Sequence, residues 1–96
     1  MIKNIFLSPK AEKDLQSIYN YINKTFGPAS AKKFENTVVD FLVLLQNYPD
    51  IGTVEVDAKD IRCFVAHYRL KIFYRIKNNK IIVLRLFDTR QHPGKR

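Results

Sequence analysis

Residues 68–87, YRLKIFYRIKNNKIIVLRLF, contain two apolar runs separated by the polar stretch KNNK. Between Leu70 and Ile76 an apolar side chain recurs at every second position, a pattern typical of a strand buried on one face. Asparagine tolerates the left-handed backbone that tight turns need. Residues 68–76 and 81–87 are therefore predicted to form a β-hairpin.

The number of residues in the turn decides which side chains share a face. An odd turn would pair the apolar residues of the two strands: Ile76 with Ile82, Tyr74 with Leu84, and Ile72 with Leu86. An even turn would place Arg85 against the core, because a one-residue slip inverts every side chain. We therefore predict the odd turn, with Arg85, Lys71 and Arg75 on the face away from the core.

The N-terminal half predicts one short strand and two helices. Residues 2–7 are apolar-rich, and Ser8-Pro9 provides an N-cap followed by proline at the first helical position. Gly27-Pro28 can end this helix and begin the next, and Tyr48-Pro49 ends the second. Each helix carries an apolar stripe, formed by Ala11, Leu15, Ile18 and Ile22, and by Ala31, Phe34, Val38, Phe41, Leu42 and Leu45.

After Gly52 the apolar period changes from helical to two, and the stretches TVEVD and IRCFVA are predicted strands. Helices joined by so short a turn form an antiparallel hairpin. The predicted fold is α+β: an N-terminal strand, then a helical hairpin packed on one face of a small, mainly antiparallel sheet.

Charge divides the chain sharply. Residues 1–58 hold six lysines, no arginine and seven acidic residues, whereas residues 59–96 hold eleven basic and two acidic residues. The corresponding net charges are −1 and +9. A one-sided basic field favours an anionic partner, either nucleic acid or an acidic protein surface. The alternative is that this charge only keeps the protein soluble.

The remaining composition fits one domain of 96 residues, with a flexible tail expected at about 92–96. Cys63 is the single cysteine, which excludes an internal disulfide and fits a reducing cytoplasm. The sequence has neither a run of about 18 apolar residues nor a signal peptide, so we expect no membrane association. No metal site or cofactor is predicted.

On the predicted sheet, the face away from the helices would form a basic groove with aromatic side chains. Such a surface suits phosphate and base contacts, or a docking peptide. Its predicted lining is Arg62 or its neighbours, Lys71, Phe73, Arg75, Arg85 and Phe87.

Several segments together resemble the RelE/ParE toxins of bacterial type II toxin–antitoxin systems. The segment AEKDLQSIYNYINKTFGPASAKKF resembles the helical hairpin of that family, and LLQNYPDIG resembles its end. The segment IRCFVAHYRLKIFYRI is similar to the arginine-containing strand and the one that follows, and IIVLRLFDTRQHP to the closing strand. The resemblance covers almost the whole chain and implies a small α+β toxin, neutralised by a cognate antitoxin.

The two branches of the family imply different activities. RelE-like toxins cut messenger RNA on the ribosome, which needs a base, an acid and positive charge on the phosphate. The resemblance offers Arg62, Arg85, His92 and Glu55 as candidates, with Asp88 or Tyr74 beside them. The lysine-rich loop of that branch is missing here, because Lys59 is the only cation in TVEVDAKDI.

We therefore favour a ParE-like toxin that docks on DNA gyrase and has no catalytic chemistry. The residues expected to bind the target or nucleic acid are Arg62, Lys71, Arg75, Arg85, Asp88 and Arg90. The first alternative is a RelE-like, ribosome-dependent endoribonuclease. The second is a nucleic-acid-binding module without toxicity.

Overall fold

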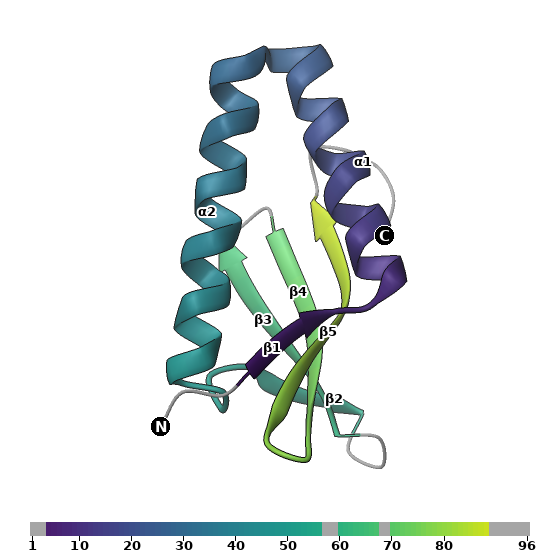
Figure 1. Ribbon diagram of the computed structural model, residues 1–96, viewed down its shortest axis with the longest axis vertical. Helices are drawn as coiled ribbons and strands as arrows, with labels where there is room; N and C mark the ends of the chain where they lie inside the picture. Colours follow the sequence, from purple (N-terminus) through teal and green to yellow (C-terminus); the bar gives the residue numbers. More distant parts are fainter. Residues whose placement is uncertain (1–3, 57–59, 68–69, 89–96) are drawn as a thin grey trace.

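The computed structural model describes residues 4–56, 60–67 and 70–88. The elements in chain order are β1 (Asn4–Leu7), α1 (Pro9–Phe26), α2 (Pro28–Asn47), β2 (Thr53–Val56), β3 (Ile61–His67), β4 (Leu70–Lys77) and β5 (Lys80–Asp88) (Figure 1). The sheet has the order β1-β5-β4-β3-β2, with β1 parallel to β5 and the other neighbours antiparallel. The predicted α+β fold is confirmed.

The predicted helix boundaries are also confirmed. The Ser8 hydroxyl accepts a hydrogen bond from the Ala11 amide at 3.0 Å, which caps the first turn of α1. Gly27 separates the helices with φ +100°, a conformation that an L side chain rarely adopts, and Pro28 opens α2. Within the described residues, no helix is long and apolar enough to span a membrane.

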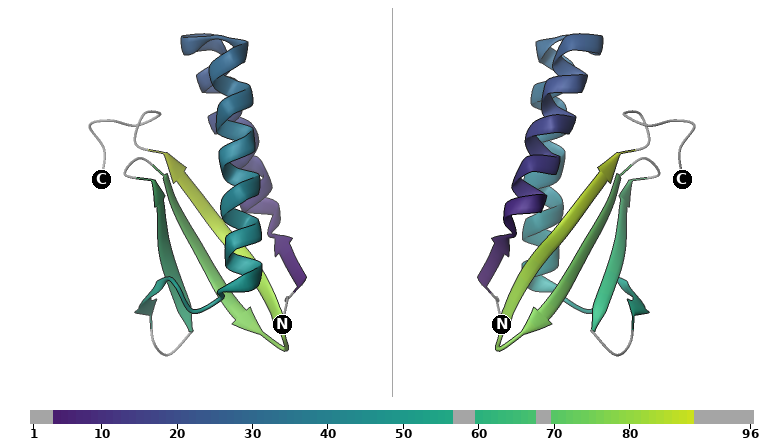
Figure 2. Two further views of the ribbon diagram at one scale, coloured as in Figure 1. Left: turned by 90° about the vertical axis from the view of Figure 1, so that its left-hand side faces the viewer. Right: turned by 90° about the vertical axis from the view of Figure 1, so that its right-hand side faces the viewer.

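The two helices lie over one face of the sheet, and their connecting end extends beyond it (Figure 2). The core between the layers includes Ile18, Ile22, Leu45, Ile72 and Tyr74, each at most 1% exposed. Full burial of an aliphatic side chain of this size stabilises a fold by about 1.5–3 kcal/mol. The other face of the sheet carries no helix (Figure 2).

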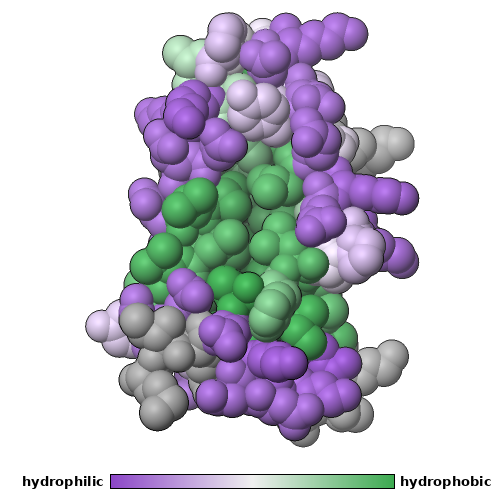
Figure 3. Space-filling model, in the orientation of Figure 1, coloured by the Kyte–Doolittle hydropathy of each residue, from purple (hydrophilic) through white to green (hydrophobic). Residues whose placement is uncertain are grey.

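Polar residues cover only part of the molecular surface on the side of the sheet where the helices lie. Figure 3 shows apolar surface in the space between the two helices, bordered by hydrophilic side chains. Val39 and Val43 of α2 are about half exposed. Contiguous apolar surface of this kind is typical of an interaction site.

The register of the β4–β5 hairpin differs from the prediction near the turn. Asn78 and Asn79 have φ of 52° and 65° and form a two-residue turn, so Ile76 lies opposite Ile81. The predicted odd turn was therefore wrong, as was the pairing of Tyr74, which lies opposite Val83. Two left-handed residues give the turn a twist that matches the strands, which explains why the even turn is stable.

A β-bulge at Leu84 then restores the register that the apolar pattern predicts. Phe73 lies opposite Arg85 and Tyr74 opposite Val83, which leaves Leu84 without a partner on β4. The carbonyls of Val83 and Leu84 both accept hydrogen bonds from Ser8, at 2.9 and 3.0 Å. Beyond the bulge, Ile72 lies opposite Leu86, and this predicted pairing is confirmed.

The bulge decides which residues of β5 enter the core. Ile81, Val83 and Leu86 are at most 2% exposed, whereas Ile82 and Leu84 are only partly buried. The prediction that Ile82 and Leu84 form the core face was wrong because the two-residue turn places Ile81 and Val83 opposite Ile76 and Tyr74, and the bulge then brings Leu86 to the core face. The extra residue at the bulge shifts the alternation by one position.

Tyr74 joins the sheet to the chain that leaves α2. Its hydroxyl donates to the Pro49 carbonyl at 2.7 Å and accepts from the Gly52 amide at 3.0 Å. A Cβ on residue 52 would lie 2.7 Å from that hydroxyl oxygen, so the close approach requires glycine. Burial raises the pKa of the Tyr74 phenol, although the Gly52 hydrogen bond opposes the shift.

We predict that Tyr74→Phe lowers the free energy of unfolding by about 1–3 kcal/mol, because it leaves the buried Gly52 amide and the partly buried Pro49 carbonyl unpaired. Urea unfolding followed by circular dichroism measures the change. Tyr48→Phe is the matched control, because Tyr48 is 61% exposed and should change stability little. Equal stabilities of the two variants would contradict the anchoring role.

We also predict a pH effect specific to Tyr74. Its pKa is raised in the folded state, so above about pH 10 the unfolded chain loses this proton first. The stabilisation is complete below that pH and declines above it, by at most about 1.4 kcal/mol per pH unit. The stability difference between the wild type and Tyr74→Phe should narrow from pH 9 to pH 11. A stability difference that stays constant from pH 9 to pH 11 would contradict a raised pKa of Tyr74 in the folded state.

Candidate functional site: the open face of the sheet

The face of the sheet away from the helices is called the open face. Cross-strand partners lie on the same face, so the register assigns its members. They include Phe6, Thr53, Ile61, Cys63, Val65, Lys71, Phe73, Arg75, Lys77, Lys80, Ile82, Arg85 and Phe87. Every charged residue in this described set is basic, and Lys71, Val65 and Phe87 are exposed.

An aromatic pair occupies the middle of the open face. The rings of Phe73 and Phe87 meet edge to face, with centroids 5.7 Å apart. The guanidinium carbon of Arg85 lies 4.8 Å from the Phe87 centroid, within cation–π range. Phe87 remains 43% exposed, so the cluster presents aromatic and cationic surface to a partner.

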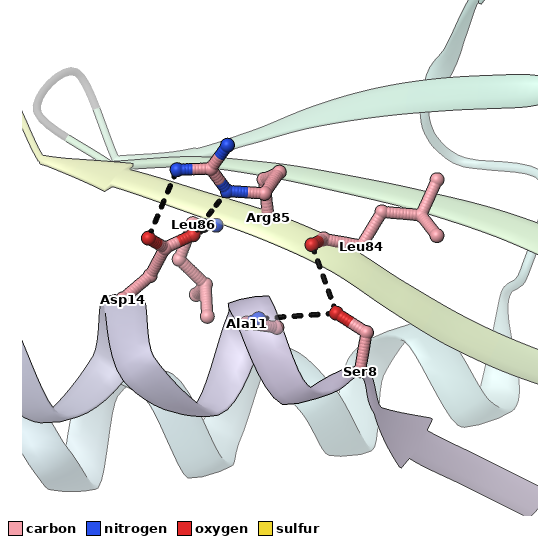
Figure 4. Close-up of polar contacts among 6 residues, drawn as sticks. All are labelled: Ser8, Ala11, Asp14, Leu84, Arg85 and Leu86. Atoms are coloured by element: carbon pink, nitrogen blue, oxygen red, sulfur yellow. Dashed lines mark hydrogen bonds and ion pairs between the residues drawn. The ribbon is translucent and has the colours of Figure 1, made fainter.

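Asp14 of α1 holds the Arg85 side chain in place (Figure 4). Its carboxylate accepts from Arg85 Nε at 2.7 Å and Nη2 at 3.1 Å, and from the Leu86 amide at 3.0 Å. This bidentate contact fixes the plane of the guanidinium and ties α1 to the edge of β5. The hydrogen bond to Asp14 raises the pKa of Arg85 above its ordinary value, so the cation persists.

Arg62 lies on the helix-covered face and not on the predicted open face. Its partner across the strands is Tyr74, a core residue, which places both side chains on the same side. Arg62 Nη1 donates to the Gly52 carbonyl at 3.2 Å, and Nη2 lies 3.9 Å from the Asp50 carboxylate. The alternation of Arg62, Cys63 and Phe64 was compatible with either face, so the sequence could not decide.

The other predicted site residues lie partly on the open face and partly elsewhere. Lys71 and Arg75 lie on the open face, as predicted. Asp88 does not, because it is 3% exposed and lies opposite the buried Leu70. Arg90 and His92 lie outside the described residues, as do the predicted tail and the side chain of Glu55.

Arg62 and Arg85 cannot meet at one phosphate in this arrangement. They belong to β3 and β5, which are separated by β4, so their backbones are roughly 10 Å apart. Their side chains also leave opposite faces of the sheet. Among the described residues, no three His, Cys, Asp or Glu side chains form a metal-binding group.

The sequence interpretation missed Asp14, although a signal existed. Asp14 lies three residues after Ala11 and four before Ile18, beside the buried stripe of α1. An acidic residue there needs a partner, because a buried carboxylate is costly unless paired. Arg85, 71 residues later in the chain, supplies it.

Comparison with known families identifies the chain. Residues 5–93 match the family model described as the ParE toxin of the type II toxin–antitoxin system, parDE. The chain belongs to the ParE toxin family. The predicted resemblance to the RelE/ParE toxins is therefore confirmed, with the ParE branch as the one matched.

Solved structures share the fold of this ParE-family chain at low sequence identity. A chain of the chromosomal ParDE system from P. aeruginosa superposes with a TM-score of 0.76 at 22% identity, covering 91% of this chain and 96% of that one. The RelBE2 complex from Mycobacterium tuberculosis gives 0.69 at 16%, covering 92% and 99%. The DinJ–YafQ complex from E. coli gives 0.62 at 14%, covering 98% and 100%. No protein of curated function shows significant sequence similarity.

We predict that Asp14→Asn lowers the free energy of unfolding of this ParE-family chain by about 1–2 kcal/mol. Hydrogen bonds to charged groups contribute about 1.5–3 kcal/mol, reduced here because the Arg85 side chain is 41% exposed. Glu35→Gln, which removes the exposed 3.4 Å pair with Lys32, is the control and should change stability by less than about 0.5 kcal/mol. Equal urea unfolding midpoints for the wild type and Asp14→Asn would contradict a structural role for Asp14.

Proposed function

We propose that this ParE-family toxin inhibits DNA gyrase by docking on it, without cutting nucleic acid. The observation that carries the proposal is the separation of Arg62 from Arg85. A ribonuclease must bring its cations and its acid and base to one phosphate. Here both arginines are engaged in contacts within the protein, on opposite faces of the sheet.

The cations available for docking lie on the open face and at the adjoining turn. Lys71 on β4 is exposed, and so are Lys77 and Lys80, which face each other beside the turn. Arg75 lies between Lys71 and Lys77 on the same face. Such a one-sided cationic surface steers association with an acidic partner and sets its orientation.

A cognate antitoxin is the second proposed partner. The M. tuberculosis and E. coli structures with this fold are toxin–antitoxin complexes. The apolar surface between the helices supports a partner that covers it with apolar side chains (Figure 3). Binding of that partner to the folded toxin alone would raise its melting temperature by mass action, so the free toxin should melt lower than the complex.

The proposal predicts that the purified toxin inhibits supercoiling by gyrase and that this depends on the open face. Lys71→Glu with Lys77→Glu should raise the concentration needed for half-inhibition about tenfold, because like charges repel an acidic target. Lys10→Glu with Lys13→Glu is the charge-matched control, since both lysines are exposed on α1. The readout is the topoisomer distribution of a relaxed plasmid.

The ribonuclease alternative makes the opposite prediction. If the toxin left supercoiling unaffected but cleaved translated messages within codons, gyrase inhibition would be wrong and the RelE-like activity correct. If the control variant and the Lys71/Lys77 variant inhibited supercoiling with equal half-inhibitory concentrations, gyrase would remain the proposed target, but the open face would not be the docking surface.

A further inference from the structure

Two aromatic side chains lie on adjacent central strands of the sheet, on the face that no helix covers. Phe73 belongs to β4 and Phe87 to β5, and their rings are in contact. Both helices pack on the opposite face (Figure 2). Several nucleic-acid-binding modules are antiparallel sheets backed by helices, and they bind single strands by stacking bases on aromatic rings of neighbouring strands.

Charges around the rings have the sign and placement that phosphates require. Lys71 lies directly opposite Phe87, and Arg85 directly opposite Phe73. Arg75 is two residues further along β4 on the same face. In the described part of the open face, no acidic residue lies among these cations. Asp14 reaches Arg85 from α1 and pairs with it, so Lys71 and Arg75 supply most of the attraction for a phosphodiester backbone.

The cluster is held in one geometry before any ligand arrives. Asp14 fixes the guanidinium plane of Arg85, which lies 4.8 Å from the Phe87 ring centroid. A base can stack on the exposed part of either planar group, because arginine planes and aromatic rings both serve as stacking platforms. Fixing the side chains in advance lowers the entropic cost of binding.

The backbone beside the rings is not available to an added peptide strand. β4 pairs with β3 on one side and with β5 on the other. The outer edge of β5 is occupied by β1, then by Ser8 at the Leu84 carbonyl and by Asp14 at the Leu86 amide. A ligand at this cluster must therefore be held by side chains, which favours stacked bases over strand addition.

We propose that the open face is a binding site for single-stranded DNA, centred on Phe87, Phe73 and Arg85. The proposal deepens the gyrase hypothesis and draws on it for the choice of DNA, because gyrase holds DNA as well as presenting a protein surface. The binding itself needs no gyrase. The two proposals can therefore fail separately.

The test uses the full chain and a fluorescein-labelled dT12 oligonucleotide at about 50 mM salt, with anisotropy as the readout. Phe87→Leu keeps apolar volume and removes the aromatic plane, so we expect about tenfold weaker binding. Phe26→Leu is the matched control, since Phe26 is 53% exposed at the far end of α1, and its affinity should equal that of the wild type. Circular dichroism confirms that both variants fold.

A salt series separates stacking from general attraction. Lys71→Ala should reduce the slope of log affinity against log salt by about 0.7, the value for one phosphate contact on single-stranded DNA. Lys10→Ala on α1 removes the same charge elsewhere and should leave the slope unchanged.

Three results obtained with dT12 would overturn the proposal. The first is no binding of dT12 at low salt. The second is an equal loss of affinity in Phe87→Leu and Phe26→Leu. The third is that a twelve-residue polyglutamate peptide displaces labelled dT12 at the same concentration as unlabelled dT12 does. Tighter binding of U12 than of dT12 would assign the face to RNA and also overturn it. Binding of dT12 by a protein that leaves supercoiling unaffected would keep the site and reject gyrase as the target.

Discussion

The contact between the Asp14 carboxylate and β5 determines how the helical hairpin is attached to the sheet. The carboxylate accepts three hydrogen bonds from two consecutive residues of β5, two from the Arg85 guanidinium and one from the Leu86 amide. β1 pairs with β5 only as far as Val83, so among the described residues no strand pairs with the rest of that edge. Ser8 and Asp14 occupy it instead, and they fix the helical hairpin at one angle over the sheet (Figure 4).

This contact also determines what the basic half of the chain can do. Arg85 stabilises the fold through its ion pair with Asp14, and its guanidinium also contacts the Phe87 ring on the open face. Arg62 is held on the other face by the Gly52 carbonyl, next to the buried Tyr74 hydroxyl. Cations that are held apart in this way suit binding along a surface better than the concentrated charge of a phosphoryl-transfer site. That arrangement supports the docking function proposed for this ParE-family toxin.

Local signals in the sequence were enough to predict the elements and their order. Ser8-Pro9 and Gly27-Pro28 mark helix boundaries through backbone preferences that no distant contact overrides. The turn between β4 and β5 was harder, because KNNK allows either parity and apolar residues fill both faces of β5. The bulge at Leu84 depends on Ser8, 76 residues earlier, and Arg85 depends on Asp14, 71 residues earlier. Neither pairing is visible from local pattern, and for the same reason the sequence left open whether Arg62 or its neighbours face the groove.

Amide hydrogen exchange at Leu86 tests the role of Asp14 most directly. If Asp14 covers this edge of β5, the Leu86 amide should exchange as slowly as core amides such as that of Ile72, and replacing Asp14 with alanine should speed its exchange by at least about a hundredfold. The amide of Ile72 should remain among the slowest-exchanging amides in both the wild type and the Asp14 variant. Exchange of Leu86 in the wild type at the rate of an open strand edge would show that Asp14 does not hold the hairpin to the sheet.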